Sequence, residues 1–153
     1  MTTIEIDHAS RWYGNVVAVN DVTMDVGPGV TGLLGPNGAG KSTLLHMMAG
    51  FLAPSTGAVR VGGSTAWHDH HLYRRVGLVP ERDAVYGYLT GWELTLASAR
   101  LHGLPRPEEA ARRALATVEL EEAAGRRVDT YSKGMRQRAK VAAALVQIGR
   151  AHV

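Results

Sequence analysis

The feature that most constrains this chain is a glycine-rich run at residues 35–42, which reads Gly-Pro-Asn-Gly-Ala-Gly-Lys-Ser. It fills the pattern G-x-x-x-x-G-K-[ST], in which glycines let several backbone N–H groups point inward at one anion. The lysine supplies a charge for the β- and γ-phosphates of a nucleotide, and the serine hydroxyl can ligate Mg²⁺. An ordinary glycine-rich turn is the alternative interpretation. The predicted phosphate-binding residues are Gly35, Pro36, Asn37, Gly38, Ala39, Gly40, Lys41, Ser42 and Thr43, with Ser42 as the magnesium ligand.

The residues on either side of the loop predict the strand–loop–helix context that such a loop requires. Residues 30–34 are a short apolar run that enters the loop directly, and this pattern predicts a buried parallel strand. Residues 41–49 have helical composition, and Gly50 is a good C-terminal cap. The loop is therefore expected to open a helix whose unpaired N–H groups and positive dipole end face the phosphates.

The rest of the chain divides into a strand-rich first part and a mostly helical last part. Alternating residues predict strands at 4–6 and 16–26, and the run after a Pro-Ser-Thr-Gly turn predicts another at 58–61. Helical periodicity then predicts helices at residues 90–101, 107–118 and 132–146, the first capped by Thr90 and the second opened by Pro107. The fold class is therefore expected to be α/β.

Composition excludes several classes of protein. With 45% hydrophobic and 20% charged residues, the 153-residue chain is globular rather than disordered. A net charge of +3 suits an anionic ligand but is much smaller than the positive charge of a typical nucleic-acid-binding protein. Without cysteine there are no disulfides or thiolate metal sites. The first residues do not resemble a signal peptide, and no apolar run approaches the roughly 18 residues of a membrane span. A soluble, cytoplasmic protein is expected.

A second segment, residues 131–138, reads Tyr-Ser-Lys-Gly-Met-Arg-Gln-Arg and separates the families that share the loop. It resembles the signature of ATP-binding-cassette proteins, usually Leu-Ser-Gly-Gly-Gln followed by a Gln/Arg stretch. The resemblance covers residues 1 to about 146 in the right order. Lys133 stands where the family usually has Gly, and Met135 where it usually has Gln, which we interpret as the mark of a subgroup with a separate membrane subunit. A solvated basic helix start is the alternative.

The resemblance implies a phosphate-loop ATPase fold with an antiparallel β subdomain and a small helical subdomain at about residues 90–130. It implies an ATP-binding transporter subunit that uses ATP and Mg²⁺ to drive a separate transmembrane permease subunit from the inner face of the membrane. Two such domains would pair head to tail, so that the signature faces the γ-phosphate of the partner's ATP. No nucleic acid is expected, although a soluble cassette protein acting on ribosomes or DNA remains the rival. The predicted signature residues are Ser132, Lys133, Gly134 and Met135.

Two further residues take roles only through the resemblance. Tyr13 matches the aromatic residue that stacks on adenine, because Gly14 follows it at the family's spacing. A surface tyrosine is the alternative, and Trp12 is the neighbouring aromatic residue. Glu81 stands where the family places a Gln that senses Mg²⁺ and the attacking water. A carboxylate can ligate Mg²⁺ directly, and a solvated loop residue is the alternative.

A run of histidines raises the possibility of a metal site. His68, Asp69, His70 and His71 are consecutive, so they cannot converge on one ion without a tight loop. A polar loop between strands is the favoured interpretation.

The hydrolytic residues of the family follow the signature helix: an Asp for Mg²⁺, a Glu that polarises water, and later a histidine. No Asp or Glu follows Asp129 here, so we expect an incomplete core and nucleotide binding without hydrolysis. Residues 148–153 match the translation of a common sequencing adapter. We therefore predict a partial cassette domain at residues 1–146 and a non-native tail at 147–153. An inactive nucleotide-binding fragment is the interpretation that fits the chain as given.

Overall fold

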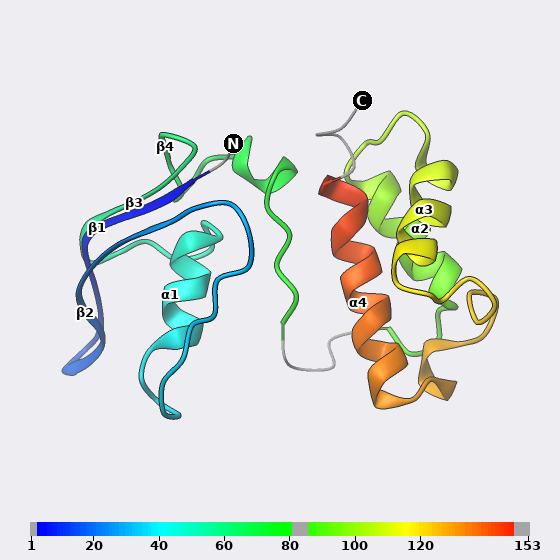
Figure 1. The fold of residues 1–153 in the computed structure, drawn as a ribbon, viewed down its shortest axis with the longest axis horizontal. Helices are drawn as coiled ribbons and strands as arrows, with labels where there is room; N and C mark the ends of the chain where they lie inside the picture. Colours follow the sequence, from blue (N-terminus) through cyan, green and yellow to red (C-terminus); the bar gives the residue numbers. More distant parts are fainter. Residues whose placement is uncertain (1–2, 81–85, 149–153) are drawn as a thin grey trace. The chain divides into compact units, whose positions relative to one another are not determined.

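The structure is a computed structural model that describes residues 3–80 and 86–148 (Figure 1). The chain forms two compact units, Met1–Tyr73 and Arg74–Val153. The first unit carries the sheet and helix α1, and the second carries three helices that pack together. Within the described ranges, every helix falls short of the length and apolarity that a membrane crossing needs.

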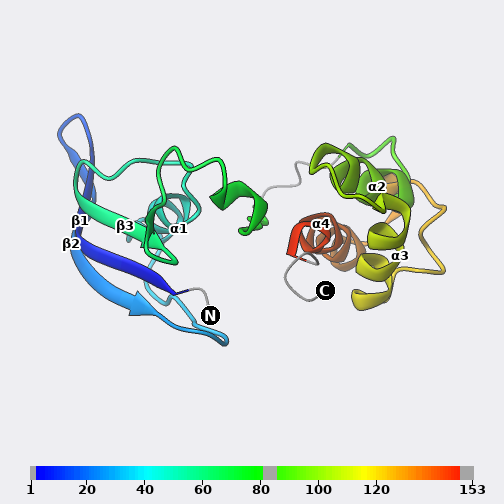
Figure 2. The same ribbon diagram turned by 90° about the horizontal axis from the view of Figure 1, so that it is seen from above.

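The first unit is built on a four-stranded antiparallel sheet whose order is β2-β1-β3-β4. Helix α1, Lys41–Met48, contacts β2 and β3 and lies against one face of this sheet (Figure 2). The predicted strands at residues 16–26 and 58–61 are confirmed, and the one at 4–6 continues to Tyr13. The strands are β1 Ile4–Tyr13, β2 Val16–Val26, β3 Thr56–Val61 and β4 Ser64–Thr65.

Helix α1 packs through one buried face and ends at a glycine. Leu44, Met47 and Met48 are buried, which is the three- and four-residue spacing of one helix face. The helix ends as predicted at Gly50, which has φ +76 and donates its N–H to the Met47 carbonyl at 3.1 Å. The next N–H, of Phe51, bonds to the carbonyl of residue 46 at 2.9 Å, so the end is a Schellman motif.

The predicted parallel strand at residues 30–34 is wrong. These residues form no strand, and Val30 and Leu34 are exposed at 104% and 92%. A parallel strand needs neighbours that pair with it and layers that cover it. Among the described residues every strand belongs to the antiparallel sheet, so no parallel ladder satisfies the backbone of this segment.

Three bulges shape the β1–β2 hairpin. Ile6 pairs with Met24 and Ala9 with Val22, so β1 carries one extra residue between these pairs. Further along the hairpin, β2 carries one extra residue at each of two places, first near Asp21 and then at Ala18. Each bulge bends its strand, and the first two compensate each other in register.

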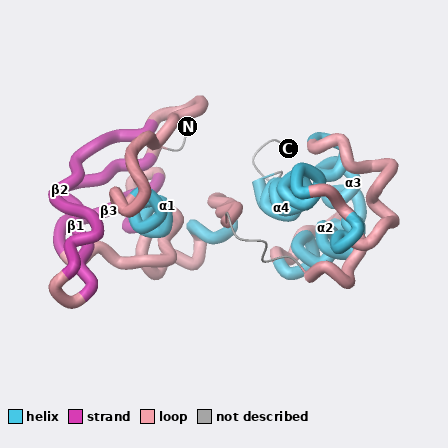
Figure 3. The backbone as a smooth tube through the Cα atoms, turned by 90° about the horizontal axis from the view of Figure 1, so that it is seen from below, coloured by secondary structure: helices cyan, strands magenta, loops and turns pink. Residues whose placement is uncertain are grey.

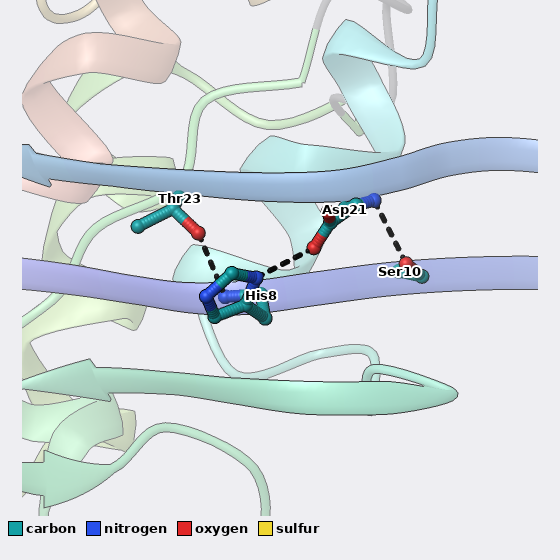
Figure 4. A network of polar contacts seen from close by, with 4 residues as sticks. All are labelled: His8, Ser10, Asp21 and Thr23. Carbon is teal, nitrogen blue, oxygen red and sulfur yellow. Dashed lines mark hydrogen bonds and ion pairs between the residues drawn. The ribbon is translucent and has the colours of Figure 1, made fainter.

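A pair of ionisable residues occupies the first two bulges. His8 and Asp21 both have φ +46, which lies in the left-handed region of backbone conformation that residues other than glycine rarely adopt. Figure 4 shows them pointing toward each other from neighbouring strands, with His8 Nδ1 at 2.7 Å from Asp21 Oδ1. The backbone N–H groups of the pair donate to the Thr23 and Ser10 hydroxyls at 3.1 and 2.8 Å. The hydrogen bond to Asp21 and then its charge raise the pKa of His8.

We expect this pair to make the stability of the first unit depend on pH. The pKa of His8 is higher in the folded chain, so its stabilisation is present below the unfolded value of about 6.5 and is lost as pH rises through the folded value. Replacing His8 with asparagine, which tolerates positive φ, removes the titrating group. Urea unfolding at about pH 5.5 and at about pH 8 gives the free energy of unfolding at each pH. From the lower to the higher pH, this free energy should fall further in the wild type than in His8→Asn. Equal losses would contradict the assignment.

The second unit contains helices whose ends follow local rules. Thr90 caps α2 in a capping box, accepting the Glu93 N–H at 3.1 Å while Glu93 Oε2 accepts the Thr90 N–H at 2.8 Å. Pro107 occupies the first turn of α3. All three predicted helices are thus confirmed (Figure 3). They are α2 Gly91–Leu101, α3 Pro107–Thr117 and α4 Lys133–Ile148, with a short 3₁₀ turn at Val128–Thr130. Another 3₁₀ turn, Leu72–Arg74, spans the boundary between the two units in the sequence.

Small residues let these helices pack closely. Ala99, Ala139 and Ala142 are fully buried where α2 and α4 contribute to the core, and Ser98 Oγ donates to the Ala143 carbonyl at 2.7 Å. Larger side chains fill the remaining space, and burying one such aliphatic side chain contributes about 1.5–3 kcal/mol. They are Leu115, Val118, Leu120, Val128, Tyr131 and Val146.

Candidate functional site

The phosphate loop leads into α1 without a side-chain cap. Gly40 is the N-cap residue, with φ +82 and ψ 5, and no acidic residue lies in the first turn. The first N–H groups of a helix have no carbonyl partner within the helix, and the dipole end there is positive. Residues 35–39 are exposed, so this helix start can receive an anion from solvent.

Lys41 lies across the loop that precedes it. Its Nζ donates to the Gly35 carbonyl at 2.8 Å and to the Pro36 carbonyl at 2.6 Å. An ammonium carries three N–H donors, so a phosphate oxygen can take the third or displace one of these carbonyls. The side chain therefore places a full positive charge inside the loop, where a nucleotide phosphate would lie.

The third bulge of the hairpin packs directly against the loop. Ala18 is the extra residue of β2, because Arg11 pairs with Val19 while Trp12 pairs with Val17. A Cβ built on Gly40 would lie only 2.0 Å from the Ala18 carbonyl oxygen. Only glycine can therefore stand at position 40 without moving β2. This contact joins the phosphate loop to the hairpin.

A hollow of about 330 Å³ lies between β2 and the loop. Its walls combine a hydrophobic strand segment with the backbone of the phosphate loop, a mixture that suits the sugar or base of a nucleotide next to a phosphate. The lining residues are Val17, Ala18, Val19, Asn20, Val22, Gly38, Ala39, Gly40, Lys41 and Leu44.

Tyr13 ends β1 at the tip of the same hairpin. The two-residue turn that follows begins with Gly14 at φ +57, the position that favours glycine in such hairpins. Tyr13 as a whole residue is 48% exposed, and the guanidinium carbon of Arg11 lies 4.9 Å from the centre of its ring. The ring is thus accessible to a planar base and already has a cation as its neighbour.

The signature residues form the start of α4 in the second unit. Ser132 is the N-cap residue, because its Oγ accepts the Met135 N–H at 3.2 Å. Lys133 and Gly134 are exposed, and the first turn of α4 contains no acidic residue. A lysine at the positive end of a helix is unfavourable unless an anion binds nearby. This terminus can therefore also receive an anion.

A buried tyrosine fixes the position of that helix start. Tyr131 is only 3% exposed, and its hydroxyl donates to the Ala123 carbonyl at 2.6 Å. Burial raises the pKa of this hydroxyl, so it stays protonated as the donor. The Arg136 guanidinium donates to the Tyr131 carbonyl at 2.5 Å, which holds the backbone next to Ser132.

The remaining predicted sites stand apart from these. Glu81 lies outside the described residues, as do residues 149–153, so their predicted roles stay predictions. Helix α4 continues through Ile148. Asp69 accepts the His71 N–H at 2.8 Å within its own loop. In the described ranges, no cluster of three or more His, Asp and Glu residues is arranged to hold a metal ion.

The structure also adds residues that sequence patterns did not single out. Ala18 carries no chemical group that a motif would record, and its role follows from the bulge alone. Arg11 could have been noticed, because it precedes Tyr13 by two residues and such residues share one face of a strand. The loop residues belong to the first unit and the signature residues to the second.

Known proteins resemble this chain over nearly its whole length. A model of the ABC transporter family matches residues 19–150. The bacitracin transport ATP-binding protein BcrA of Enterococcus faecalis is 36% identical over 145 residues, 94% of this chain and 47% of that protein. The Nod factor export ATP-binding protein I of Rhizobium etli is 37% identical over 150 residues, 95% of this chain and 48% of that protein. The chain spans about half the length of the curated relatives it matches.

Solved structures show the same likeness. An ATP-binding subunit of an ABC transporter is 28% identical with a TM-score of 0.75, covering 94% of this chain and 62% of that one. CbiO1 of Clostridium perfringens, part of the ABC transporter complex cbiONQ, has a TM-score of 0.84 at 23% identity over 94% of this chain and 61% of that one, a likeness of fold alone. The predicted phosphate-loop ATPase fold is confirmed. With the family match extending over most of its residues, the chain belongs to the ABC transporter family of ATP-binding proteins.

Proposed function

We propose that this chain provides the ATP-binding part of a transporter subunit that couples ATP binding and hydrolysis to movement of a membrane partner. The observation that carries the proposal is the loop at residues 35–41, where an uncapped helix start and the Lys41 ammonium converge on the place for a phosphate. The Ser42 hydroxyl, exposed at the second residue of α1, would hold Mg²⁺ together with the phosphates, and Glu81 is a second candidate ligand. Tyr13 would contact the adenine.

The signature helix start would serve a second copy of the domain. Ser132 and Gly134 are exposed at the positive end of α4, and Lys133 adds a charge there. These features suit the γ-phosphate of an ATP held by a partner in a head-to-tail dimer. The membrane partner would be a separate permease subunit, which is the arrangement that Lys133 and Met135 in the signature favour. Sedimentation of the full-length protein tests the pairing, because ATP should double its mass.

The 153 residues themselves are proposed to bind ATP without turning it over. No carboxylate follows Asp129 in this stretch, so none of its residues can occupy the place of the catalytic Asp and Glu of the family. Nucleic acid is not proposed as a partner, because a net charge of +3 is too small for a surface that binds a nucleic-acid backbone.

Nucleotide titration tests the proposal. Since the loop and Lys41 would contact mainly the phosphates, we expect ATP to bind more tightly than AMP by a factor on the order of a hundred, about 3 kcal/mol. Equilibrium dialysis with radiolabelled nucleotides measures this ratio, and a phosphate-release assay on the same samples should detect no turnover. AMP binding as tightly as ATP would show that the loop is not the site. Phosphate release that grows with the amount of chain would overturn the second statement.

A further inference from the structure

We propose that Arg11 positions Tyr13 for base stacking, by supporting one face of the tyrosine ring with a guanidinium group that is itself held in place. The inference rests on the proposed function, because it takes Tyr13 as the residue that contacts the base of a bound nucleotide. It adds to that site a residue that need not touch the nucleotide. Arg11 is therefore a positioning residue rather than a catalytic one.

The contact between the two side chains has the geometry of a cation–π interaction. The guanidinium carbon of Arg11 lies 4.9 Å from the centre of the Tyr13 ring, within the range of about 6 Å for such contacts. The two residues alternate with Trp12 along β1, so they lie on the same side of the strand. Tyr13 remains 48% exposed, so a base can reach the ring face that Arg11 does not cover. A cation behind the ring draws electron density from it, which favours stacking of an electron-rich purine on the other face.

The Arg11 guanidinium combines one hydrogen bond with the contact to the Tyr13 ring. Nη1 donates to the Ala53 carbonyl at 3.2 Å. The Nε–H is buried and has no hydrogen-bond partner in the described part of the chain. An arginine placed for hydrogen bonding alone would use its planar fork of donors, and an unpaired buried donor is unusual. The guanidinium is instead oriented by one carbonyl and one aromatic face.

The segment at residues 53–55, which accepts the hydrogen bond from Arg11, also binds the backbone of β1 on either side of Arg11. The Ser55 N–H donates to the Ser10 carbonyl at 2.7 Å, and the Trp12 N–H donates to Ser55 Oγ at 3.1 Å. Both bonds attach the end of β1 to the segment that follows α1, the helix opened by the phosphate loop. The backbone under Arg11 is thus fixed relative to the phosphate loop, so the guanidinium is a stationary support for a ring at an otherwise exposed hairpin tip.

Replacing Arg11 with methionine tests the role, because methionine keeps the length of the side chain and removes its charge. We expect ATP binding to weaken by about three- to tenfold, while binding of inorganic tripolyphosphate changes by less than about twofold. Tripolyphosphate lacks a base, so it reports the phosphate loop alone. Arg11→Lys should restore much of the ATP affinity, because an ammonium also binds an aromatic face. The melting temperature should change little, since the substitution also removes an unpaired buried donor.

A double-mutant cycle separates positioning from a general effect of charge. If Arg11 acts through the ring, the variant with both Arg11→Met and Tyr13→Leu should bind ATP no more weakly than Tyr13→Leu alone. Independent losses in the double variant, equal losses for ATP and tripolyphosphate, or tighter ATP binding by Arg11→Met would each overturn the inference. A wild-type chain that does not bind ATP would overturn the proposed function instead, so the two failures are distinguishable.

Discussion

Replacement of Lys41 by methionine is expected to weaken MgATP binding on the order of a hundredfold, because it removes the only full charge inside the phosphate loop. Methionine keeps the aliphatic part of the side chain, so the packing of the first turn of α1 is preserved. The variant also loses the two hydrogen bonds from Nζ to the Gly35 and Pro36 carbonyls, which will make the loop less ordered. Calorimetric titration with MgATP measures the affinity directly.

The matched control for this variant is Arg60→Met in the same unit. Arg60 lies on β3, where its guanidinium is 3.8 Å from the Asp7 carboxylate and exposed to solvent. The control removes one positive charge from the unit but none from the loop, so ATP affinity should stay within about twofold. If both variants lose affinity equally, the effect is one of net charge. If Lys41→Met binds ATP as the wild type does, the nucleotide does not use this loop.

The second large effect is expected at Gly40. A methyl group at this position would lie 2.0 Å from the Ala18 carbonyl oxygen, so Gly40→Ala must displace the β2 backbone or the start of α1. We expect a loss of about 3 kcal/mol or more in the free energy of unfolding, from backbone displacement added to the cost of a positive φ. Urea unfolding followed by circular dichroism measures it.

Gly38→Ala is the control for that experiment. Gly38 has φ +83, almost the same as the φ of +82 at Gly40, so both variants bear the same backbone cost of about 1–2 kcal/mol. A Cβ at Gly38 meets no atom within 4 Å, so the control lacks the collision. The difference between the two variants therefore isolates the contact between the loop and the β2 bulge. Equal stabilities would mean that this contact does not hold the hairpin against the loop.

Local features of the sequence predicted much of the fold because their causes lie within a few residues. Thr90 as a helix cap, Pro107 at a helix start and Gly50 at a helix end are each recognised from neighbouring positions, and each defines the helix end it predicted. The family was also predictable, because the phosphate loop and the segment at 131–138 are short motifs.

The prediction at residues 30–34 was wrong for a physical reason that a local pattern cannot contain. Val30 and Leu34 have the composition of a buried strand, yet strand formation depends on partners elsewhere in the chain. Among the described residues no parallel partner exists for them. A hydrophobic run thus indicates that a segment can form a buried strand. It does not indicate whether other parts of the chain pair with that strand and bury it.

The sequence by itself determined the family of this protein and its candidate site residues: a glycine-rich loop with Lys41, a helix start at Ser132, and an aromatic residue at position 13. Only the tertiary structure decided how these groups are supported: the Ala18 bulge lies against Gly40 of the loop, and the Arg11 guanidinium lies over the ring of Tyr13. Motifs can be recognised in the sequence because a ligand needs those groups at fixed spacing. Bulges and supporting contacts depend on pairing between distant residues, and the backbone geometry that creates them is set only when the strands meet.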